Sequence, residues 1–410
     1  MPIAPVVALI LGFIASLIAI PACAQADVER ARRSIAAVEE TLKQRPDDAT
    51  LWFYLARFQS EAGNIDAALA ALAKVEALGE GYLPVRSLGF EKVWGDARFQ
   101  AARARLEAKL PRLDYAATAI ELGDRGLIPE GLAHDERSRS FFLGSIAKKK
   151  IVRVSHFNVV SDFAGPFSEL DSVLGLAVDA PRRTLYAVST SALTAQGRAR
   201  PRNAVFAFDV DSGRLVRRFE VAEAAQLNDV AVASGGRVFA SDSGNGAIYE
   251  IPKEGAVRTL VPAGQLRGSN GLAVSPDVQR LYVAHTTGLA VVDIASGAVK
   301  RVANATRESI AAIDGLYEWQ GELVGVQNST TPGRVILISL SREGDSVTRV
   351  KTLLSHHHGA LDEPTTGAVS DQGFFFLLAA TGVSHYNDQG TLDNPDTVPD
   401  PTVLRVLLPR

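Results

Sequence analysis

One short phrase recurs six times in the chain, and its spacing limits the fold more than any other feature of the sequence. Each copy usually has a small or polar residue, then Gly, then an apolar strand, a tight turn and a second apolar strand. The copies begin at Glu130, Leu174, Asn228, Asn270, Asp314 and Thr366. The steps between them are 44, 54, 42, 44 and 52 residues. A period of roughly 40–50 residues with several strands per unit is typical of a β-propeller. We therefore predict a mainly β fold with six blades.

Four of the six phrases begin with a short oxygen donor: Glu130, Asn228, Asn270 and Asp314. In a propeller the equivalent position of each blade points toward the central axis, so these residues are expected to meet there. A single Asn or Asp before Gly usually marks only a turn. Because the donors recur at one phase of four blades, the pattern favours a shared site. We predict a metal site at the axis.

The β pattern extends over residues 118–410, which we assign to the propeller. The C-terminal strand, residues 403–408, brings the sixth blade to three strands. We expect residues 118–122 to supply the fourth, so that the two ends of the domain pair and close the ring. Closure removes free sheet edges, which otherwise promote aggregation.

The first 24 residues carry no charged side chain and are apolar from residue 6 to residue 20. The run is short for a membrane span and ends in Ala22, Cys23 and Ala24, as at a signal-peptide cleavage site. We predict that residues 1–24 are a signal peptide and that the mature protein is periplasmic or secreted, without a membrane span. Cys23 is the single cysteine. A lipoprotein signal with Cys23 as the lipidated residue is the alternative.

Residues 27–113 have a helical period. Trp52 and Ala56, followed by Gly63 and Asn64 at a turn, resemble a tetratricopeptide repeat. One such repeat is fewer than an independent solenoid needs. Two roles therefore stay open for this segment: a cap packed on the propeller, or a groove for a protein partner. The predicted helices cover residues 27–45, 48–62, 65–78 and 97–110.

Composition is that of a soluble globular protein, with 47% hydrophobic residues, 22% charged residues and a formal net charge of −3. The lack of a basic excess argues against nucleic-acid binding. The sequence has no Gly-x-Ser-x-Gly elbow, Walker loop, HExxH or Rossmann glycine pattern. The axial oxygen donors therefore carry the functional prediction.

Two of the six phrases carry a resemblance to a known family. Glu130-Gly131 in the first blade, and Asn270-Gly271 with Ser275-Pro276-Asp277 in the fourth, resemble the gluconolactonase, senescence-marker-protein and luciferin-regenerating family over residues 118–410. The resemblance implies that Glu130, Asn270 and Asp314 hold one divalent ion at the axis. It also implies that Asn228 lies beside the metal and helps to hold substrate or a metal-bound water.

Carboxylate and amide oxygens are hard ligands, so calcium is our first expectation for the ion, with magnesium, manganese or zinc as alternatives. An ion of this kind with open positions polarises a carbonyl group and lowers the pKa of bound water. The resemblance implies that Asp314 also acts as general base toward that water. We predict hydrolysis of a small-molecule lactone or related ester. The alternative is a non-catalytic propeller that binds a ligand or a protein around a structural ion.

Some polar residues depart from the family pattern or lie outside it. Gln226 stands two positions before Asn228, where family members that act on sugar acids carry an Arg able to pair with a carboxylate. His285 is expected on a surface hairpin, with an acid–base role as the alternative. The run His356-His357-His358 is expected in a solvated loop. Four residues at strand ends are expected to be packing or turn residues: Asp242, Ser243, Gln327 and Asn328.

Overall fold

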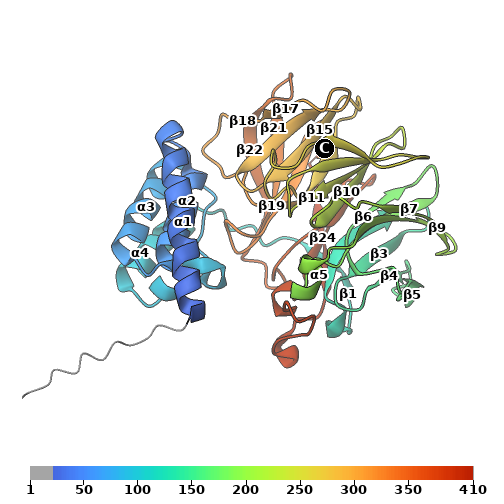
Figure 1. The fold of residues 1–410 in the computed structure, drawn as a ribbon, viewed down its shortest axis with the longest axis horizontal. Helices are drawn as coiled ribbons and strands as arrows, with labels where there is room; N and C mark the ends of the chain where they lie inside the picture. The colour runs from blue at the N-terminus through green and yellow to red at the C-terminus, as the bar shows by residue number, and fades with distance from the viewer. Residues whose placement is uncertain (1–21, 410) are drawn as a thin grey trace, which may run out of the picture.

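The computed structural model describes residues 22–409. The predicted signal peptide, residues 1–24, lies outside the described residues except for its last three. A helical N-terminal part lies beside a ring of β-sheets (Figure 1). Among the described residues, no helix is both long and apolar enough to cross a membrane.

The described helical part has four α-helices: α1 (Ala22–Gln44), α2 (Ala49–Glu61), α3 (Ile65–Leu78) and α4 (Ala97–Glu107). The last three begin within one residue of the predicted segments, whereas α1 begins five residues earlier than predicted. The Asp48 side chain caps α2 by accepting hydrogen bonds from the backbone N–H groups of Thr50 and Leu51, and Asp96 caps α4 in the same way. Such caps satisfy donors that have no partner within the helix. The helices enclose their own apolar core, in which Phe53 and Phe99 are fully buried.

Six sheets form the propeller, as the period of the phrase predicts. In blades one to five each blade strand pairs antiparallel with the next along the chain, and blade five gains a short parallel strand beside β22. Blade one contains β2 (Pro129–Asp135), β3 (Ser140–Ser145), β4 (Lys150–Val154) and β5 (Val160–Ala164), and blade two contains β6 (Ser172–Asp179), β7 (Thr184–Thr190), β8 (Asn203–Asp209) and β9 (Leu215–Glu220). Blade three contains β10 (Leu227–Val232), β11 (Val238–Asp242), β12 (Ile248–Ile251) and β13 (Arg258–Val261), and blade four contains β14 (Leu272–Val274), β15 (Arg280–His285), β16 (Gly288–Asp293) and β17 (Val299–Arg301). Blade five contains β18 (Ala303–Asn304), β19 (Ile313–Trp319), β20 (Glu322–Gln327), β21 (Arg334–Leu340) and β22 (Ser346–Ser355). A short helix, α5 (Ala195–Ala199), connects β7 to β8.

The sixth blade closes the ring with strands from both ends of the domain. It contains β23 (Gly367–Ser370), β24 (Phe374–Ala380), β25 (Thr402–Leu407) and β1 (Ala117–Glu121), and β1 pairs antiparallel with β25. The predicted fourth strand over residues 118–122 is therefore confirmed. Joining the two ends in one sheet couples the first and last parts of the propeller and completes the sixth blade with its fourth strand.

The Gly of the repeated phrase is required where neighbouring blades approach one another. A Cβ atom on Gly131 would lie 1.9 Å from the backbone oxygen of Leu174, and one on Gly271 would lie 2.4 Å from the backbone oxygen of Asp314. The Gly271 N–H donates a hydrogen bond to that same Asp314 oxygen at 2.7 Å. Because glycine has no side chain, the innermost strands can come close enough to bring the leading residues of the phrases together.

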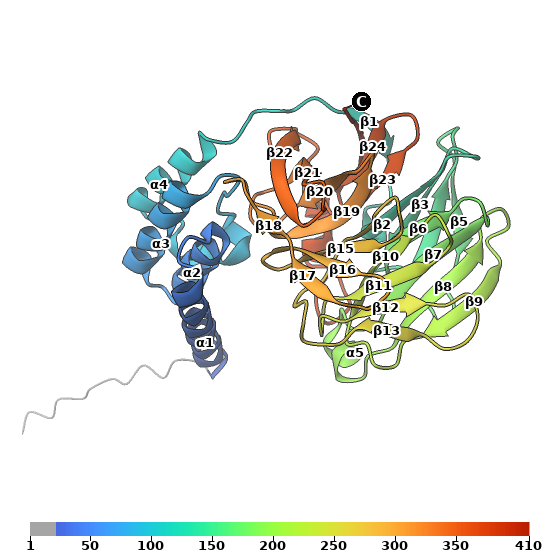
Figure 2. The ribbon, with the colours of Figure 1, turned by 90° about the horizontal axis from the view of Figure 1, so that it is seen from above.

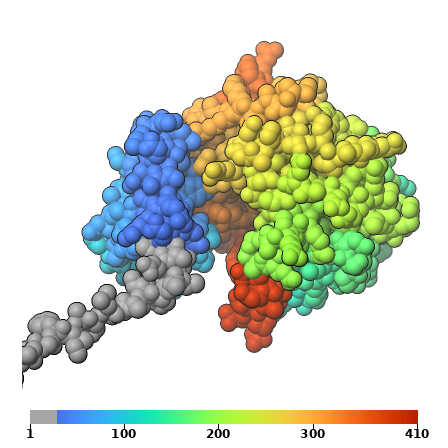
Figure 3. Space-filling model, in the orientation of Figure 1, coloured from blue at the N-terminus to red at the C-terminus, as the bar shows by residue number. Residues whose placement is uncertain are grey.

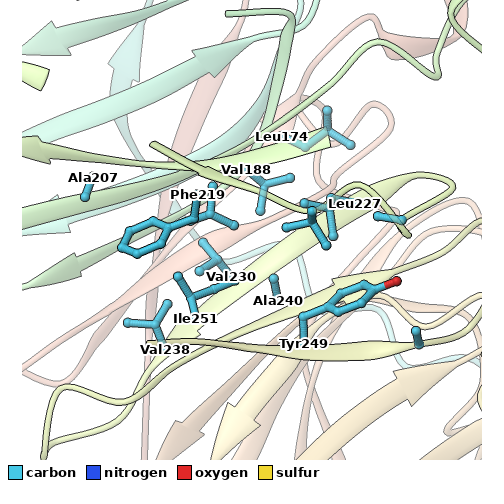
Figure 4. Close-up of a cluster of buried hydrophobic side chains, with 14 of the residues drawn as sticks. Leu174, Val188, Ala207, Phe219, Leu227, Val230, Val238, Ala240, Tyr249 and Ile251 are labelled. Carbon is cyan, nitrogen blue, oxygen red and sulfur yellow. The ribbon is translucent and has the colours of Figure 1, made fainter. Parts of the chain in front are cut away.

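Apolar side chains fill the space between adjacent blades. In the cluster between blades two and three, Val188 of β7, Leu227 of β10 and Tyr249 of β12 are buried together (Figure 4). Burial of apolar surface at about 25 cal/mol per Å² makes such interfaces the main stabilising contacts of a propeller. The packed blades therefore form a rigid frame for side chains at the axis.

The helical part is docked on blades four and five (Figure 2). The segment after α3 forms a short bridge with the propeller: the Glu80 N–H donates to the Arg307 oxygen at 2.8 Å, and the Ser309 N–H donates to the Glu80 oxygen at 2.9 Å. The Leu83 N–H donates to the Thr330 oxygen at 2.7 Å. Backbone hydrogen bonds of this kind fix the position of the helices on the sheets.

Candidate functional site

Two of the predicted ligands are in direct contact at the axis. Asn270 lies two residues before β14 of blade four, and Asp314 is the second residue of β19 in blade five. The Asn270 Nδ2 donates a hydrogen bond to Asp314 Oδ1 at 2.7 Å. Since a carboxylate can only accept, this contact sets the orientation of the amide. The Asn270 Oδ1 atom is buried and has no hydrogen-bond partner among the described residues.

Glu130, the second residue of β2, is the third predicted ligand, and its side chain is buried without compensation. The residue is 7% exposed, and its Oε2 atom has no hydrogen-bond partner in the described part of the chain. Its backbone oxygen accepts hydrogen bonds from the hydroxyl groups of Thr365 at 3.0 Å and Thr366 at 2.7 Å. Thr366, which leads the sixth phrase, thus positions Glu130.

Asp229 was not among the predicted site residues, yet it is buried beside them. It is 5% exposed, and its Oδ2 accepts a hydrogen bond from the Leu272 N–H at 3.1 Å. A Cβ atom on Gly175 would lie 2.5 Å from Asp229 Oδ1, so the glycine of blade two makes room for this carboxylate. The signal in the sequence was an acidic residue at the phrase position that other blades fill with Gly.

The side chain of the predicted neighbour Asn228 makes a hydrogen bond within blade three. Its Nδ2 donates to the Ser243 hydroxyl at 3.2 Å, which is its one side-chain hydrogen bond among the described residues. Asn328, expected to be a packing or turn residue, instead contacts the site: its Nδ2 donates to Asp314 Oδ2 at 2.6 Å. The amide that holds the second oxygen of Asp314 is therefore Asn328, and this contact depends on how blade five turns after β20.

Burial raises the pKa of all three carboxyl groups, and neighbouring acids add to the increase at Glu130 and Asp229. Burial raises the pKa of Glu130 well above its usual range, and the charges of Asp314 and Asp229 add to the effect. Burial raises the pKa of Asp314 to about 6, although the hydrogen bonds from Asn328 and Asn270 oppose the shift. Burial likewise raises the pKa of Asp229 to about 7. Three acids with so little compensating positive charge form an environment that favours a bound cation.

Tyr317 also belongs to this environment. Its hydroxyl oxygen accepts a hydrogen bond from the Gly367 N–H at 2.7 Å. Burial raises the pKa of Tyr317 well above its usual range, and Asp229, Asp314 and Glu130 add to the increase. The phenol is therefore protonated at neutral pH. It also lines a cavity of about 550 Å³ whose other walls are mostly aliphatic segments of the inner strands.

A smaller cavity of about 350 Å³ opens directly onto Asp314, Asn270 and Asn328. Its opposite wall is supplied by the helical part: Tyr54, Arg57 and Phe58, all from α2, line it. The size is at the lower end of the range for small-molecule sites. The cavity thus lies between the propeller and α2, with the predicted ligands on the propeller side.

His285 was expected on a surface hairpin, and in the structure it lines this same cavity. Burial lowers its pKa to about 4, and the charges of Arg301 and Arg45 lower it further. The Nδ1 atom accepts a hydrogen bond from the Thr287 N–H at 3.4 Å. At neutral pH His285 is therefore an uncharged wall of the cavity, so it adds no positive charge to it.

The three consecutive histidines have a carboxylate neighbour that the sequence did not indicate. Glu107, in the last turn of α4, brings its Oε1 to 3.4 Å from His356 Nε2. Ligand atoms of Glu107, His356 and His357 lie within 4.8 Å of one another. This group is at the junction of the helical part with the loop after β22, away from the axial carboxylates.

The axial residues fit a hard divalent cation. Of the six buried side-chain atoms that lack a hydrogen-bond partner in the described part of the chain, two are oxygens of predicted ligands, Glu130 Oε2 and Asn270 Oδ1. Asp314 supplies a further carboxylate in contact with Asn270. Carboxylate and amide oxygens are the ligands that Ca²⁺ and related ions prefer. Glu130, Asn270 and Asp314 are thus the residues that would hold such an ion.

The same acids predict a pH-dependent stability for the metal-free protein. Asp314 and Asp229 have an ordinary pKa of 3.8 and folded values of about 6 and about 7. A raised carboxyl pKa gives a stabilising contribution that is complete below about pH 4 and is lost as pH rises through 6 and 7. We expect the Tm of chelator-treated protein to fall by a few degrees from about pH 5 to about pH 8, and Ca²⁺ to restore it chiefly at the higher pH.

Thermal unfolding at both pH values, with and without chelator, measures this effect. Asp229→Asn is the matched variant, because an amide oxygen can still accept from the Leu272 N–H but no longer titrates. The fall in Tm should be smaller in this variant. A fall of equal size in both proteins would mean that other groups cause the pH dependence.

The fold and this cluster define a six-bladed β-propeller with an oxygen-rich axial site. Residues 128–318 match the family described as the SMP-30/Gluconolactonase/LRE-like region, so this stretch of the propeller is a domain of that kind and the resemblance drawn from the sequence is confirmed. The family includes gluconolactonases, which are lactone hydrolases. No curated protein matches the chain.

Several solved structures are similar to this chain at low sequence identity and with TM-scores below 0.5. A gluconolactonase from Xanthomonas campestris is 17% identical, with 73% of this chain and 99% of that chain covered and a TM-score of 0.48. A putative oxidoreductase (glucose dehydrogenase) from Thermus thermophilus is 17% identical, with coverage of 71% and 98% and a TM-score of 0.47. A luciferin-regenerating enzyme is 13% identical, with coverage of 71% and 95% and a TM-score of 0.47.

Proposed function

We propose that this protein is an exported, divalent-metal-dependent hydrolase of a lactone or related ester. One observation carries the proposal: buried oxygens of Glu130 and Asn270 lack hydrogen-bond partners among the described residues, and Asn270 is held by Asp314, which lines an open cavity. Oxygens left in this state are costly unless a cation compensates them. The match of residues 128–318 to a family that includes lactone hydrolases supports the reaction class.

When bound, a divalent ion of this kind supplies a Lewis acid that polarises an ester carbonyl and makes water more acidic. Asp314 is the residue that we assign as general base, because it faces the cavity and both of its oxygens are fixed by the amides of Asn270 and Asn328. A carboxylate oxygen has two acceptor positions, so either oxygen can take a proton from water while it keeps its amide contact. Asn270 and Asn328 thereby orient the base.

The proposal of export rests on the sequence of residues 1–24. Determining the N-terminal residue of the mature protein tests it.

The alternative function, a ligand-binding propeller with a structural ion, predicts the same unpartnered oxygens. It does not require a cavity at Asp314. The opening of about 350 Å³ beside Asp314 is the feature that favours the enzyme.

Metal titration of the metal-stripped mature protein tests the proposal. Calcium, manganese, magnesium and zinc would each be added while hydrolysis of a panel of sugar lactones is followed by proton release. We expect turnover that depends on the added ion and saturates with it. Metal binding that raises Tm without turnover on any lactone would replace the hydrolase with the binding alternative, and no metal binding at all would reject the axial site.

A further inference from the structure

We propose that Arg57 of α2 recognises an anionic group on the substrate, and that the natural substrate is therefore a small lactone that carries a carboxylate. This inference rests on the proposed function, because it names the substrate class for the same cavity. It assigns a functional role to the helical part, which the sequence left open between a cap and a partner-binding groove.

Arg57 faces the cavity that contains the axial residues. It lines the same space of about 350 Å³ as Asp314 and Asn270, on the opposite wall (Figure 3 shows the surface hollowed between the blue helical part and the propeller). Among the described residues that line this cavity, Arg57 alone carries a permanent positive charge. A ligand held at Asp314 by one end can therefore reach the guanidinium with the other.

The guanidinium is oriented but retains free donors. Its Nε donates to Glu61 Oε1 at 3.0 Å, one turn further along α2, and its side chain remains 30% exposed. Neither terminal nitrogen has a hydrogen bond to any described residue. An arginine held by a carboxylate at Nε can still present its two terminal nitrogens as a fork to a second carboxylate. Glu61 reduces the net charge, so geometric pairing rather than long-range attraction would select the ligand.

The position of α2 on the propeller is fixed by two contacts on the N-terminal side of Arg57. The Tyr54 hydroxyl donates to the Thr286 backbone oxygen of blade four at 3.0 Å. Asp48, the cap of α2, forms an ion pair with Arg301 at 3.1 Å. A charge presented by a docked helix loses little freedom when it binds a ligand, because the helix is already ordered.

The remaining α2 residues suit a ring-shaped ligand. Tyr54 and Phe58 line the cavity beside Arg57, with ring centroids 6.3 Å apart and planes inclined by 21°. Such a wall can pack against the carbon face of a sugar ring while Arg57 pairs with a substituent. The cavity therefore has the proposed hydrolytic residues on one wall, and two aromatic rings and one guanidinium on the other. Together these features match a carboxylate-bearing sugar lactone.

The test uses two substrates that differ in a single group. The γ-lactones of gluconic acid and glucaric acid carry a hydroxymethyl group and a carboxylate, respectively, at the carbon farthest from the lactone carbonyl. We expect the wild-type protein to prefer the glucaric lactone. Arg57→Gln should lower kcat/KM for that lactone roughly ten- to hundredfold, the usual effect of losing a charge-assisted pair, and leave the gluconic lactone within about threefold.

Two further variants test whether the loss comes from the guanidinium of Arg57 itself. Arg57→Lys keeps the charge but not the fork, so it should recover part of the loss on the glucaric lactone. Arg86→Gln is the matched control: Arg86 lies in the same helical part, pairs with Glu91 and does not line the cavity, so both substrates should be unaffected. Equal losses on both lactones in Arg57→Gln would mean that Arg57 only supports α2, and no loss would mean that it does not contact substrate.

Failure of the proposed function can be separated from failure of this inference by a binding measurement. If the wild-type protein hydrolyses no lactone, calorimetric titration with the two intact lactones still tests Arg57. Tighter binding of the glucaric lactone that is lost in Arg57→Gln would support the anion subsite without the hydrolase. Equal binding of the two lactones, or no binding of either, would overturn it.

Discussion

Replacing Glu130 by glutamine is expected to have two effects of opposite sign. The affinity for Ca²⁺ should fall roughly a hundredfold or more, because divalent-ion sites depend strongly on the number of charged ligands. The metal-free protein should become more stable at about pH 8, with a Tm a few degrees higher, because the variant no longer buries a carboxylate beside Asp314 and Asp229. A loss of affinity combined with a gain of stability cannot arise from general damage to the fold.

The sign of the stability change follows from the pKa of Glu130. Burial raises this pKa well above the ordinary value of 4.5, so at low pH the wild-type side chain is already protonated and resembles glutamine. The gain in Tm should therefore vanish near pH 4. Calcium titration by calorimetry and thermal unfolding in chelator measure the two effects. Glu136→Gln, an acidic residue of the blade-one hairpin that accepts from the Asp371 N–H, is the control and should change neither.

If Glu130→Gln instead lowered Tm in chelator and left the calcium affinity unchanged, Glu130 would be a packing residue. The axial site would then have to be assigned to other oxygens, and Asp229 with Asp314 would be the remaining acidic pair at the axis.

The second large effect is expected for Asp314→Asn. The variant removes the group that we assign as general base, and loss of such a group typically slows turnover by about 10²–10⁴-fold. An amide at this position also presents one N–H₂ group toward a neighbouring amide, Asn270 or Asn328, where the wild-type carboxylate accepts from both. We therefore expect a near-complete loss of metal-dependent lactone hydrolysis together with weaker metal binding.

Measurements at saturating metal separate the two roles of Asp314. If the residue only helped to hold the ion, a high metal concentration would restore the wild-type rate. If it is the base, kcat stays low when the site is filled. Glu318→Gln is the control on the same strand, because the Glu318 side chain accepts from the Gly321 N–H in the hairpin turn after β19. Full activity of Asp314→Asn at ordinary metal concentrations would remove Asp314 from the mechanism.

The sequence alone identified the residues whose positions follow from the blade repeat. The phrase fixes the phase of each inner strand, and Gly131 and Gly271 allow the close approach between blades, so Glu130, Asn270 and Asp314 could be assigned to one end of the axis. The same repeat predicted six blades and closure of the ring by residues 118–122. These features depend on local patterns that recur within each blade, and a period can be read without knowing any contact between distant segments.

Asp229 and Asn328 show where the repeat stops being informative. Asn228 occupies the repeating position, yet it bonds to Ser243, and the adjacent Asp229 is the residue buried near the other acids. Asn328 lies at a strand end, where the repeated phrase does not predict the direction in which a side chain points. A shift of one residue along a strand exchanges the faces on which side chains lie, so small irregularities in register decide which residue reaches the site.

Only the tertiary structure placed the helical part over the cavity. Tyr54 and Thr286 are 232 positions apart, and Glu107 and His356 are 249 positions apart. Neither contact belongs to a repeat. The residues that form them are of types that occur at many other positions in the helices and loops. Contacts of this kind depend on how two separately patterned parts pack against each other, and the amphipathic period of a helix indicates that one face is buried without specifying its partner. The sequence thus determined the propeller and the acids at its axis, whereas the packing of α2 on blade four determined that Arg57 faces them.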